Sequence, residues 1–339
     1  MILLTGGTGL VGSHLLYRLT SEGNKVRALK RLESQMDILE KIFHWYNPSG
    51  YQAQLKLIEW VDGNVSDVLS LQDAIKGIKQ VYHCAAVVSF IPSERPQMLK
   101  INIDGTANLV NVSLKEGVEK FCHCSSIAAV GRPDKGTWVD ESLIWKTSKK
   151  NSYYSISKFG AEREVWRGSE EGLDVVIVNP SVIIGPGDPN RSSARLFTTV
   201  KNGLRFYSSG STGFVDARDV ASAMHLLMES DISNERYILN SENISYKLLF
   251  EIFAKYAGVR PPFFRAGRTM SEIAWRLEKM RSLVTGSNPL ITRETARSAN
   301  SRYEFSNEKA QRELNIRFKT VEEAAQNTAA FFEKYPEYQ

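Results

Sequence analysis

The residues MILLTGGTGLVGSHL (Met1–Leu15) decide the fold of this chain, because they join a short apolar run to a turn rich in glycine. The run Ile2–Leu4 predicts a buried strand, and Gly6, Gly9 and Gly12 then begin an amphipathic helix. In such a turn the first glycine permits the bend, the second lets a pyrophosphate approach, and the third lets helix and strand pack closely. Free N–H groups at the start of the helix favour an anion. The sequence therefore predicts a dinucleotide-binding turn, formed by Gly6, Thr8, Gly9, Leu10, Val11 and Gly12.

The composition indicates an ordinary folded protein. Its 339 residues are 42% hydrophobic, and the net charge of +5 is divided between 43 basic and 38 acidic side chains. That balance argues against nucleic acid or an anionic membrane as a partner. No apolar run is long enough to cross a bilayer, and the N-terminus lacks the pattern of a secretory signal. We therefore expect a cytoplasmic protein without a membrane span.

The three cysteines are expected to be reduced, buried thiols. They lie in segments with strand patterns, at Cys84, Cys122 and Cys124. Strand alternation sends His123 to the face opposite both neighbouring cysteines. We therefore predict no metal site.

Strand patterns alternate with helix patterns over the first two thirds of the chain. The predicted strands are Ile2–Thr5, Lys25–Leu29, Leu55–Val61, Gln80–Cys84, Lys120–Cys124, Val175–Asn179 and Arg236–Asn240. Several of these runs are apolar on both faces, as in a sheet covered on both sides. The prediction is an α/β protein with a Rossmann-type, doubly wound parallel sheet.

The alternation breaks after Asn179, which predicts a smaller, mostly C-terminal substrate-binding lobe. We assign residues 1–179 and about 213–240 to the dinucleotide-binding domain, and about 180–212 and 241–339 to the interleaved lobe. A lobe so placed would cover the cofactor and shape the substrate pocket. A helix is predicted over Thr269–Leu283, and we expect its apolar stripe to pack on the lobe rather than to contact a membrane or form a lid; the stripe contains Ile273, Ala274, Leu277 and Met280.

The end of the second predicted strand indicates which dinucleotide binds. A carboxylate there would hold the ribose hydroxyls of NAD, whereas basic residues would pair with the extra phosphate of NADP. This strand runs into Lys30 and Arg31, with no carboxylate at that position. The charge pattern favours NADP, while NAD stays open if the two cations are simply a solvated strand end.

A serine, a tyrosine and a lysine form the candidate catalytic group. Tyr154 and Lys158 are four residues apart, so they share one helix face, and Ser126 follows the fifth predicted strand. Reduction of a carbonyl needs an acid at the oxygen, and a phenol with a pKa of about 10 must be tuned for that role. A neighbouring ammonium would lower that pKa. We expect Tyr154 to act as general acid, Lys158 to tune it and to bind the nicotinamide ribose, and Ser126 or the adjacent Ser125 to hold the substrate oxygen.

With these motifs, the chain resembles the extended short-chain dehydrogenases/reductases, the NAD(P)-dependent epimerase/dehydratase superfamily. The resemblance covers nearly the whole length and also rests on the segments Val81–Ala86, Asn102–Asn108, Asn179–Gly187 and Val215–Ala221. It implies that further residues lie along the cofactor, namely Asn64, Val65, Ala85, Ala86, Pro180 and Val182. At Asn64 the carboxylate that usually reaches the adenine is replaced by an amide, which can both donate and accept.

Within the superfamily the chain looks most like the dihydroflavonol reductase and hydroxysteroid dehydrogenase branch. The matching stretches are Val26–Arg31, Asn179–Gly187 and Ser306–Leu314. This resemblance implies an NADP-dependent reductase of an apolar aldehyde or ketone, in a protein that can form homodimers. It does not identify the substrate.

Two other functions compete with carbonyl reduction. A nucleotide-sugar epimerase or dehydratase would use the same tyrosine and lysine with NAD, and Arg191, Arg195 and Arg265 could then bind a second diphosphate. Dehydratases of this superfamily usually have acidic residues just after Ser126, where this chain has Ile127–Ala129. A non-catalytic NADP-binding regulator is the third alternative, although such proteins tend to lose the tyrosine or lysine.

Overall fold

A parallel sheet forms the centre of the computed structural model, which describes residues 1–149, 151–191, 193–289 and 291–338. Within these residues seven strands follow the order β11-β7-β5-β4-β1-β2-β3, and all neighbours are parallel. The strands are β1 (Ile2–Thr5), β2 (Val26–Lys30), β3 (Ile58–Asp62), β4 (Gln80–His83), β5 (Lys120–Cys124), β7 (Asp174–Pro180) and β11 (Glu235–Leu239). The order reverses between β1 and β4, where ligands of such sheets bind. This topology confirms the predicted Rossmann-type fold.

All seven predicted strands occur; β1 and β5 have the predicted bounds, and the ends of the other five differ by one to three residues. The largest difference is at β3, which begins at Ile58 because Tyr51–Leu55 form the short helix α3. The strand β2 ends at Lys30, one residue later than predicted.

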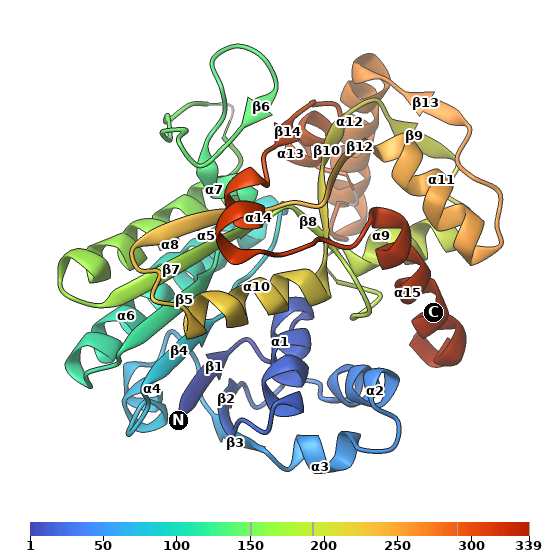
Figure 1. The fold of residues 1–339 in the computed structure, drawn as a ribbon. Helices are drawn as coiled ribbons and strands as arrows, with labels where there is room; N and C mark the ends of the chain where they lie inside the picture. The colour runs from blue at the N-terminus through green and yellow to red at the C-terminus, as the bar shows by residue number, and fades with distance from the viewer. Residues whose placement is uncertain (150, 192, 290, 339) are drawn as a thin grey trace.

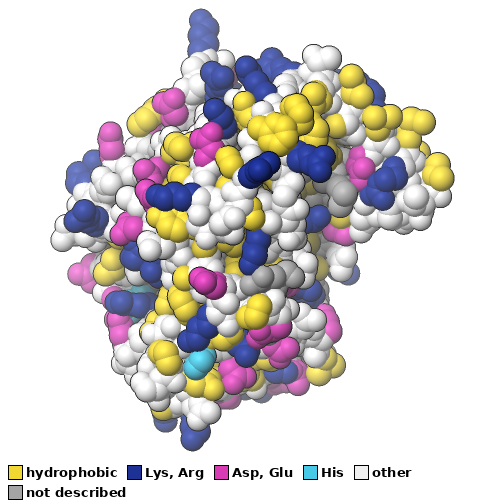
Figure 2. All heavy atoms as spheres, turned by 90° about the vertical axis from the view of Figure 1, so that its right-hand side faces the viewer, with side chains coloured by type: hydrophobic (Ala, Val, Ile, Leu, Met, Phe, Trp, Pro, Cys, Tyr) yellow, Lys and Arg dark blue, Asp and Glu magenta, His cyan; other side chains and the backbone are white. Residues whose placement is uncertain are grey.

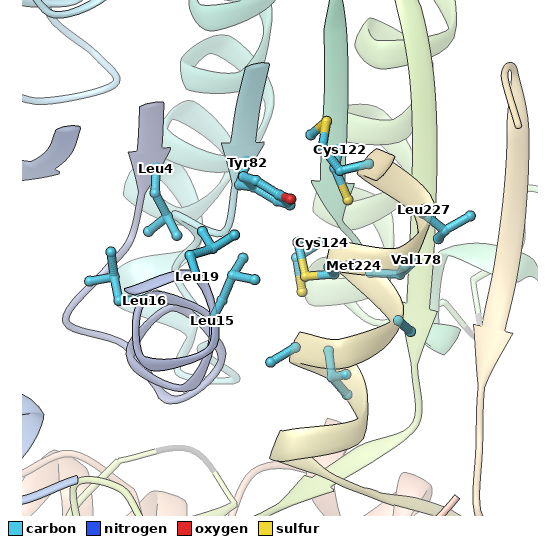
Figure 3. Close-up of a cluster of buried hydrophobic side chains, with 14 of the residues drawn as sticks. Leu4, Leu15, Leu16, Leu19, Tyr82, Cys122, Cys124, Val178, Met224 and Leu227 are labelled. Atoms are coloured by element: carbon cyan, nitrogen blue, oxygen red, sulfur yellow. The ribbon is translucent and has the colours of Figure 1, made fainter. Parts of the chain in front are cut away.

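Helices cover both faces of the sheet (Figure 1). On one face α1 (Leu10–Ser21) and α10 (Ala217–Glu229) pack on Leu4, Tyr82 and Val178, as Figure 3 shows. On the other face α4 (Val68–Ala74), α6 (Gly105–Lys115) and α8 (Tyr153–Glu170) pack on Leu3 and its neighbours. Because alternate residues of a strand point to opposite faces, Leu3 packs against the helices on one face of the sheet and Leu4 against those on the other.

The cysteines and His123 point to opposite faces of β5. Cys122 and Cys124 belong to the core cluster under α1 and α10 (Figure 3). The ring of His123 lies 5.1 Å from the ring of His83, and all three cysteines are free thiols.

The remaining strands form small sheets beside the large one. They are β8 (Val182–Ile184), β10 (Ser211–Asp216) and β12 (Glu242–Ser245) in one sheet, β9 (Phe206–Ser208) with β13 (Phe264–Ala266), and β6 (Trp138–Val139) with β14 (Glu304–Phe305). The other helices are α2 (Asp37–Tyr46), α5 (Arg95–Leu99), α7 (Ile127–Val130), α9 (Ala194–Lys201), α11 (Tyr246–Ala257), α12 (Arg268–Thr285), α13 (Arg293–Ser298), α14 (Glu308–Leu314) and α15 (Val321–Lys334), with short turns η1 (Pro92–Glu94), η2 (Lys100–Asp104) and η3 (Pro336–Tyr338).

A second hydrophobic core joins α9, α11 and α15 to the three-stranded sheet. It is rich in aromatic rings, including Phe197, Phe214, Phe253 and Phe332. Phe197 stacks on Phe332 with 5.6 Å between ring centroids. The strand β10 pairs with β8 and β12 of this part, not with the large sheet. The division into two interleaved lobes, with the boundaries given above, stays a prediction.

The helix α12 corrects one expectation from the sequence. It exists and extends over Arg268–Thr285, but none of its residues is buried. Ile273, Leu277 and Met280 are 55%, 61% and 64% exposed, so the predicted packing of this stripe on the lobe is wrong. The physical reason is that the helix turns another side toward the protein, on which Ser271, Ala274, Trp275, Glu278 and Ser282 are partly buried. No described helix is long and apolar enough to traverse a lipid bilayer.

Candidate active site

The glycine turn brings the end of β1 against the segment that follows β4. Gly6 has a φ of +76°, and a Cβ on it would lie 2.6 Å from the backbone nitrogen of Ala85. A Cβ on Gly12 would collide with the carbonyl oxygen of Gly6. Gly9 caps α1 without a side-chain hydrogen bond, and the first turn of α1 has no acidic residue. The helix therefore offers free N–H groups to an anion.

A cavity of about 500 Å³ opens beyond the carboxyl ends of β1, β2 and β4. Ten of the residues predicted to bind the dinucleotide line it: Gly6, Thr8, Gly9, Leu10, Lys30, Arg31, Asn64, Val65, Ala85 and Ala86. Its size suits a large part of a dinucleotide, since ligand sites commonly span about 300 to 1,000 Å³. The cradle around Gly6, Gly9 and the start of α1 fits a pyrophosphate.

Other predicted cofactor residues lie outside this lining. Gly12 is buried in the first turn of α1, and Val11 packs on the core cluster. Pro180 is the last residue of β7, and Val182 begins β8. Tyr154 and Lys158 lie on α8, beyond the end of β5. Whether they contact the cofactor stays a prediction.

The cations at the end of β2 are each paired with a carboxylate. Lys30 Nζ lies 2.5 Å from Oδ1 of Asp62, its neighbour on β3. Arg31 is 3.3 Å from Glu33, and its backbone nitrogen donates to Ser34 Oγ at 3.1 Å. Both cations and Ser34 line the cavity. A phosphate bound at this end would contact the ammonium of Lys30 and the guanidinium of Arg31, but it would share both groups with these carboxylates.

The opposite wall of the cavity was not predicted residue by residue. It is formed by Gly187, Asp188 and Arg191, and Arg191 lies 3.2 Å from Asp188. The segment Asn179–Gly187 was recognised as a motif, but its continuation past Gly187 has no pattern of its own. Only the folded chain brings it opposite the glycine turn.

The helix α8 carries Tyr154 and Lys158 in its first turns. It begins after Ser152, whose hydroxyl accepts from the backbone nitrogen of Ser155 at 3.0 Å. Lys158 is buried, and its Nζ donates to the carbonyl oxygen of Cys124 at 2.8 Å. The lysine is thus anchored to the end of β5, directly before the two candidate serines.

Ser126 and Ser125 have different surroundings. Ser126 caps α7, accepting from the backbone nitrogen of Ala128 at 3.2 Å, and it is the hydrogen-bond partner of the Tyr154 phenol. Ser125 is buried, its Oγ has no hydrogen-bond partner among the described residues, and its hydroxyl lowers the pKa of the nearby Glu162 carboxyl. The geometry therefore favours Ser126 as the serine beside the phenol.

The pKa of Tyr154 moves in the direction opposite to the expectation from the sequence. Burial raises the pKa of Tyr154 to about 12, and the hydrogen bond with Ser126 offsets only part of this. Lys158 does not lower it here, because its ammonium is directed at the carbonyl of Cys124. Burial also lowers the pKa of Lys158. Tyr154 is accordingly a protonated phenol at neutral pH.

A buried polar network lies beneath the serines, and sequence reasoning missed its central residue. Glu162 is one helical turn after Lys158, hydrogen-bonds Asn179 and lies 3.7 Å from Arg236. Asn179 also donates to the carbonyl oxygen of Ser126 at 3.0 Å. Burial raises the pKa of Glu162, and its hydrogen-bond partners oppose that rise. The network fixes the backbone of Ser126 relative to α8.

Asn102 forms a second tie between the cavity and α8. It lies in η2, a π-helical turn, a feature often found at functional sites. Its side chain bonds both backbone groups of Val87, at 2.7 Å and 2.9 Å, and donates to Ser157 Oγ at 3.0 Å. The segment after β4 is thereby held against the helix that carries Tyr154.

A model of the NAD dependent epimerase/dehydratase family matches residues 2–239, from the glycine turn to the end of β11. The chain belongs to this family. Membership confirms the predicted superfamily and establishes an NAD(P)-binding reductase or epimerase class for the protein. The matched region contains Ser126, Tyr154 and Lys158 as well as the cavity wall formed after β1, β2 and β4.

Curated members of the epimerase/dehydratase family similar to this chain include reductases. The chain is 28% identical to a "Putative dihydroflavonol 4-reductase" of Synechocystis sp., over 98% of this chain and 94% of the relative. It is 28% identical to Cinnamoyl-CoA reductase 1 of Petunia hybrida, over 76% of this chain and 77% of the relative. The crystal structure of gox2253 superposes with a TM-score of 0.81 and 30% identity, covering 99% of this chain and 98% of that one.

Proposed function

We propose that the protein is an NADPH-dependent reductase that converts an apolar aldehyde or ketone into an alcohol. The observation that carries this proposal is the half-buried Tyr154 phenol beside Ser126, with Lys158 one helical turn away on α8 and its ammonium at the end of β5. An acid, a hydroxyl and a cation thus lie beyond the end of β5, the strand next to β4 in the sheet. A bound nicotinamide would supply the hydride.

In this proposal Tyr154 donates its proton to the carbonyl oxygen as that oxygen gains negative charge. A pKa of about 12 keeps the phenol protonated at neutral pH, so the proton is in place, but it lies above the operating pH at which a general acid is most efficient. Ser126 holds the same oxygen through its hydroxyl. Lys158, whose ammonium is anchored on Cys124, would bind the nicotinamide ribose of the cofactor.

The choice of NADPH rests on Lys30 and Arg31. Both line the cavity at the end of β2, where the adenosine ribose of a dinucleotide lies in such folds. The backbone of Arg31 and the hydroxyl of Ser34 close the same turn at 3.1 Å. A phosphate there would bind Lys30 and Arg31. It would replace part of the ion pairing of these two cations with Asp62 and Glu33.

An apolar substrate fits the surroundings of Tyr154. The ring of Phe90 packs edge-on against the Tyr154 ring, with 5.7 Å between centroids. The two curated relatives are named for reduction of a flavonoid and of a cinnamoyl thioester, both of which carry aromatic rings. A carbonyl attached to an aromatic or aliphatic body is therefore the substrate class that we propose.

One observation favours a nucleotide sugar as the alternative substrate. A second, more polar cavity of about 600 Å³ is lined by Arg265, Arg268 and Arg302, together with Ser209 and Ser301. Guanidinium groups bind diphosphates well. An epimerase acting on such a substrate would return the hydride to the sugar and would consume no added cofactor.

A spectrophotometric screen of NADPH oxidation tests the proposal. Purified protein is offered aldehydes, ketones and nucleotide sugars, with Tyr154→Phe as the control variant. We expect NADPH loss with at least one apolar carbonyl and its disappearance in Tyr154→Phe. Thermal stabilisation by UDP-sugars without any carbonyl-dependent oxidation would favour the epimerase, and NADPH binding without any reaction would favour the regulator.

A further inference from the structure

We infer that α12 and the neighbouring β9–β13 ribbon form a surface that adsorbs onto anionic phospholipid membranes. We call this surface the α12 face. It consists of Phe206, Phe263, Phe264, Met270, Ile273, Leu277, Met280 and Val284, all exposed, with the cations around them. It lies on the side of the molecule that Figure 2 displays, where hydrophobic and basic side chains gather in the upper part.

The helix α12 is oriented with its apolar stripe outward. Met270, Ile273, Leu277, Met280 and Val284 are spaced by three and four residues, so they form one stripe along the helix. The partly buried side chains of the helix are Ser271, Ala274, Trp275, Glu278 and Ser282, so one aromatic ring and otherwise small or polar groups face the protein. A helix that packs on its own protein normally does the reverse. This arrangement leaves an apolar stripe for an external partner.

Aromatic rings extend the α12 face beyond the helix. Phe264 of β13 stacks on Phe206 of β9 with 5.5 Å between ring centroids, and Phe263 lies 4.4 Å from Phe264. The described part of the chain has 21 exposed large hydrophobic side chains, and eight of them lie between positions 263 and 284. Exposed apolar side chains in such density mark an interaction surface.

The charge around this face identifies the partner. Between Gly258 and Asn288 six Lys or Arg residues accompany two Glu residues, so this short stretch holds four of the chain's five net positive charges. Arg276 and Arg281 pair with Glu272 and Glu278 on the same helix. Arg260, Arg265, Arg268 and Lys279 have no ion-pair partner among the described residues. Exposed apolar side chains together with unpaired cations from the same stretch of chain match an anionic lipid surface, in which the helix lies flat.

A second copy of the chain fits this face less well. Two-fold pairing would bring the same surface of both copies together. The free arginines would then face arginines, with few carboxylates to compensate. Lipid headgroups supply the missing negative charge, and the acyl boundary accepts the apolar stripe.

Vesicle co-sedimentation of the full chain tests the inference without any substrate. The vesicles consist of phosphatidylcholine alone or mixed with phosphatidylglycerol, at low and at high NaCl concentration. We expect binding only to the mixed vesicles, and weaker binding at high salt. Ile273→Ser with Leu277→Ser should lower the vesicle affinity by about tenfold or more. Arg268→Ala and Lys279→Ala should each lower it by about fivefold.

Matched control variants distinguish an effect of the α12 face from the general effect of removing an exposed apolar or basic side chain. Leu69→Ser and Ile144→Ser remove exposed apolar side chains elsewhere, and Lys56→Ala and Lys115→Ala remove exposed cations elsewhere. These variants should bind vesicles as the parent protein does, and all variants should keep their NADPH affinity.

The inference fails if mixed vesicles are not bound at low salt, or if Ile273→Ser with Leu277→Ser binds them normally. A dimer in light scattering that this double variant converts to monomer, without vesicle binding, would assign the face to a second copy. Loss of NADPH-dependent reduction has no bearing on this result.

Discussion

Lys30 and Asp62 form an ion pair of 2.5 Å across the carboxyl ends of β2 and β3, at the rim of the dinucleotide cavity. The side chain of Lys30 is a quarter exposed and that of Asp62 about half exposed, so solvent screens the pair. The carboxylate therefore competes with a phosphate for the lysine without holding it tightly. Under the proposed function, this competition makes Lys30 and Asp62 the residues to test for selectivity between NADPH and NADH.

Lys30→Ala should weaken NADPH binding by about tenfold, because a hydrogen bond between charged groups is lost. Asp62→Asn should strengthen NADPH binding severalfold, since Lys30 is then free for the phosphate. Affinity for NADH should change little in either variant. Fluorescence titration of both nucleotides measures this, with Lys25→Ala, just before the far end of β2, as the control. Equal losses for NADH and NADPH would refute the phosphate role.

Tyr154→Phe should abolish carbonyl reduction, by about a hundredfold or more, because the proton donor at the substrate oxygen is missing. The variant should keep its melting temperature and its nucleotide affinity within severalfold. Tyr153→Phe is the matched control, since Tyr153 is the preceding residue but its ring packs under the guanidinium of Arg95 at 4.1 Å. Similar rates for Tyr153→Phe and Tyr154→Phe would mean that the phenol of Tyr154 is not the acid.

The pH dependence should differ between the two directions of the reaction. The acid form of Tyr154 donates in reduction, and burial raises its pKa to about 12, so the phenol stays protonated across the neutral range. Reduction should therefore not decline between about pH 7 and pH 9 through this group. Alcohol oxidation needs the phenolate, whose fraction rises about tenfold for each pH unit below the pKa. Initial rates in both directions test this, and a reduction rate that already halves by about pH 8 would contradict it.

Gly6→Ala should lose dinucleotide binding, because its Cβ would lie 2.6 Å from the backbone of Ala85. Gly23→Ala is a close control, since Gly23 has a similar φ of +81° but open space around it. The left-handed backbone costs about 1 kcal/mol in both variants. The collision should add about 1 to 3 kcal/mol for Gly6→Ala alone. Chemical denaturation and NADPH titration measure the two effects, and equal stability losses would show that the turn tolerates a side chain.

The sequence was sufficient for the fold where local pattern and global topology agree. The glycine turn and the alternating strands from β1 to β11 predicted the parallel sheet, and the four-residue spacing placed Tyr154 and Lys158 on one face of α8. The same spacing also led to one wrong prediction, that Lys158 would lower the pKa of Tyr154. It could not show that Lys158 would direct its ammonium to Cys124, which depends on where β5 ends relative to the helix.

Other features depend on contacts between distant segments. Lys30 meets Asp62 only because β2 and β3 are neighbours, and Glu162 meets Asn179 only because α8 packs beside β7. No local pattern marks either pair. The stripe of α12 was visible in the sequence, but the side on which the protein lies was not, since small and polar residues can also pack against a lobe.

The transfer of deuterium into the product, from NADPH that carries deuterium at both C4 positions of its nicotinamide, tests the central claim most directly. The labelled cofactor is mixed with the protein and the best carbonyl of the screen, and the alcohol is analysed by mass spectrometry. Carbonyl reduction predicts one deuterium on the carbinol carbon for each NADPH consumed, and no labelled product with Tyr154→Phe. An alcohol product without carbon-bound deuterium would contradict the account. Turnover of a nucleotide sugar while the deuterium stays on the nicotinamide cofactor would contradict it as well.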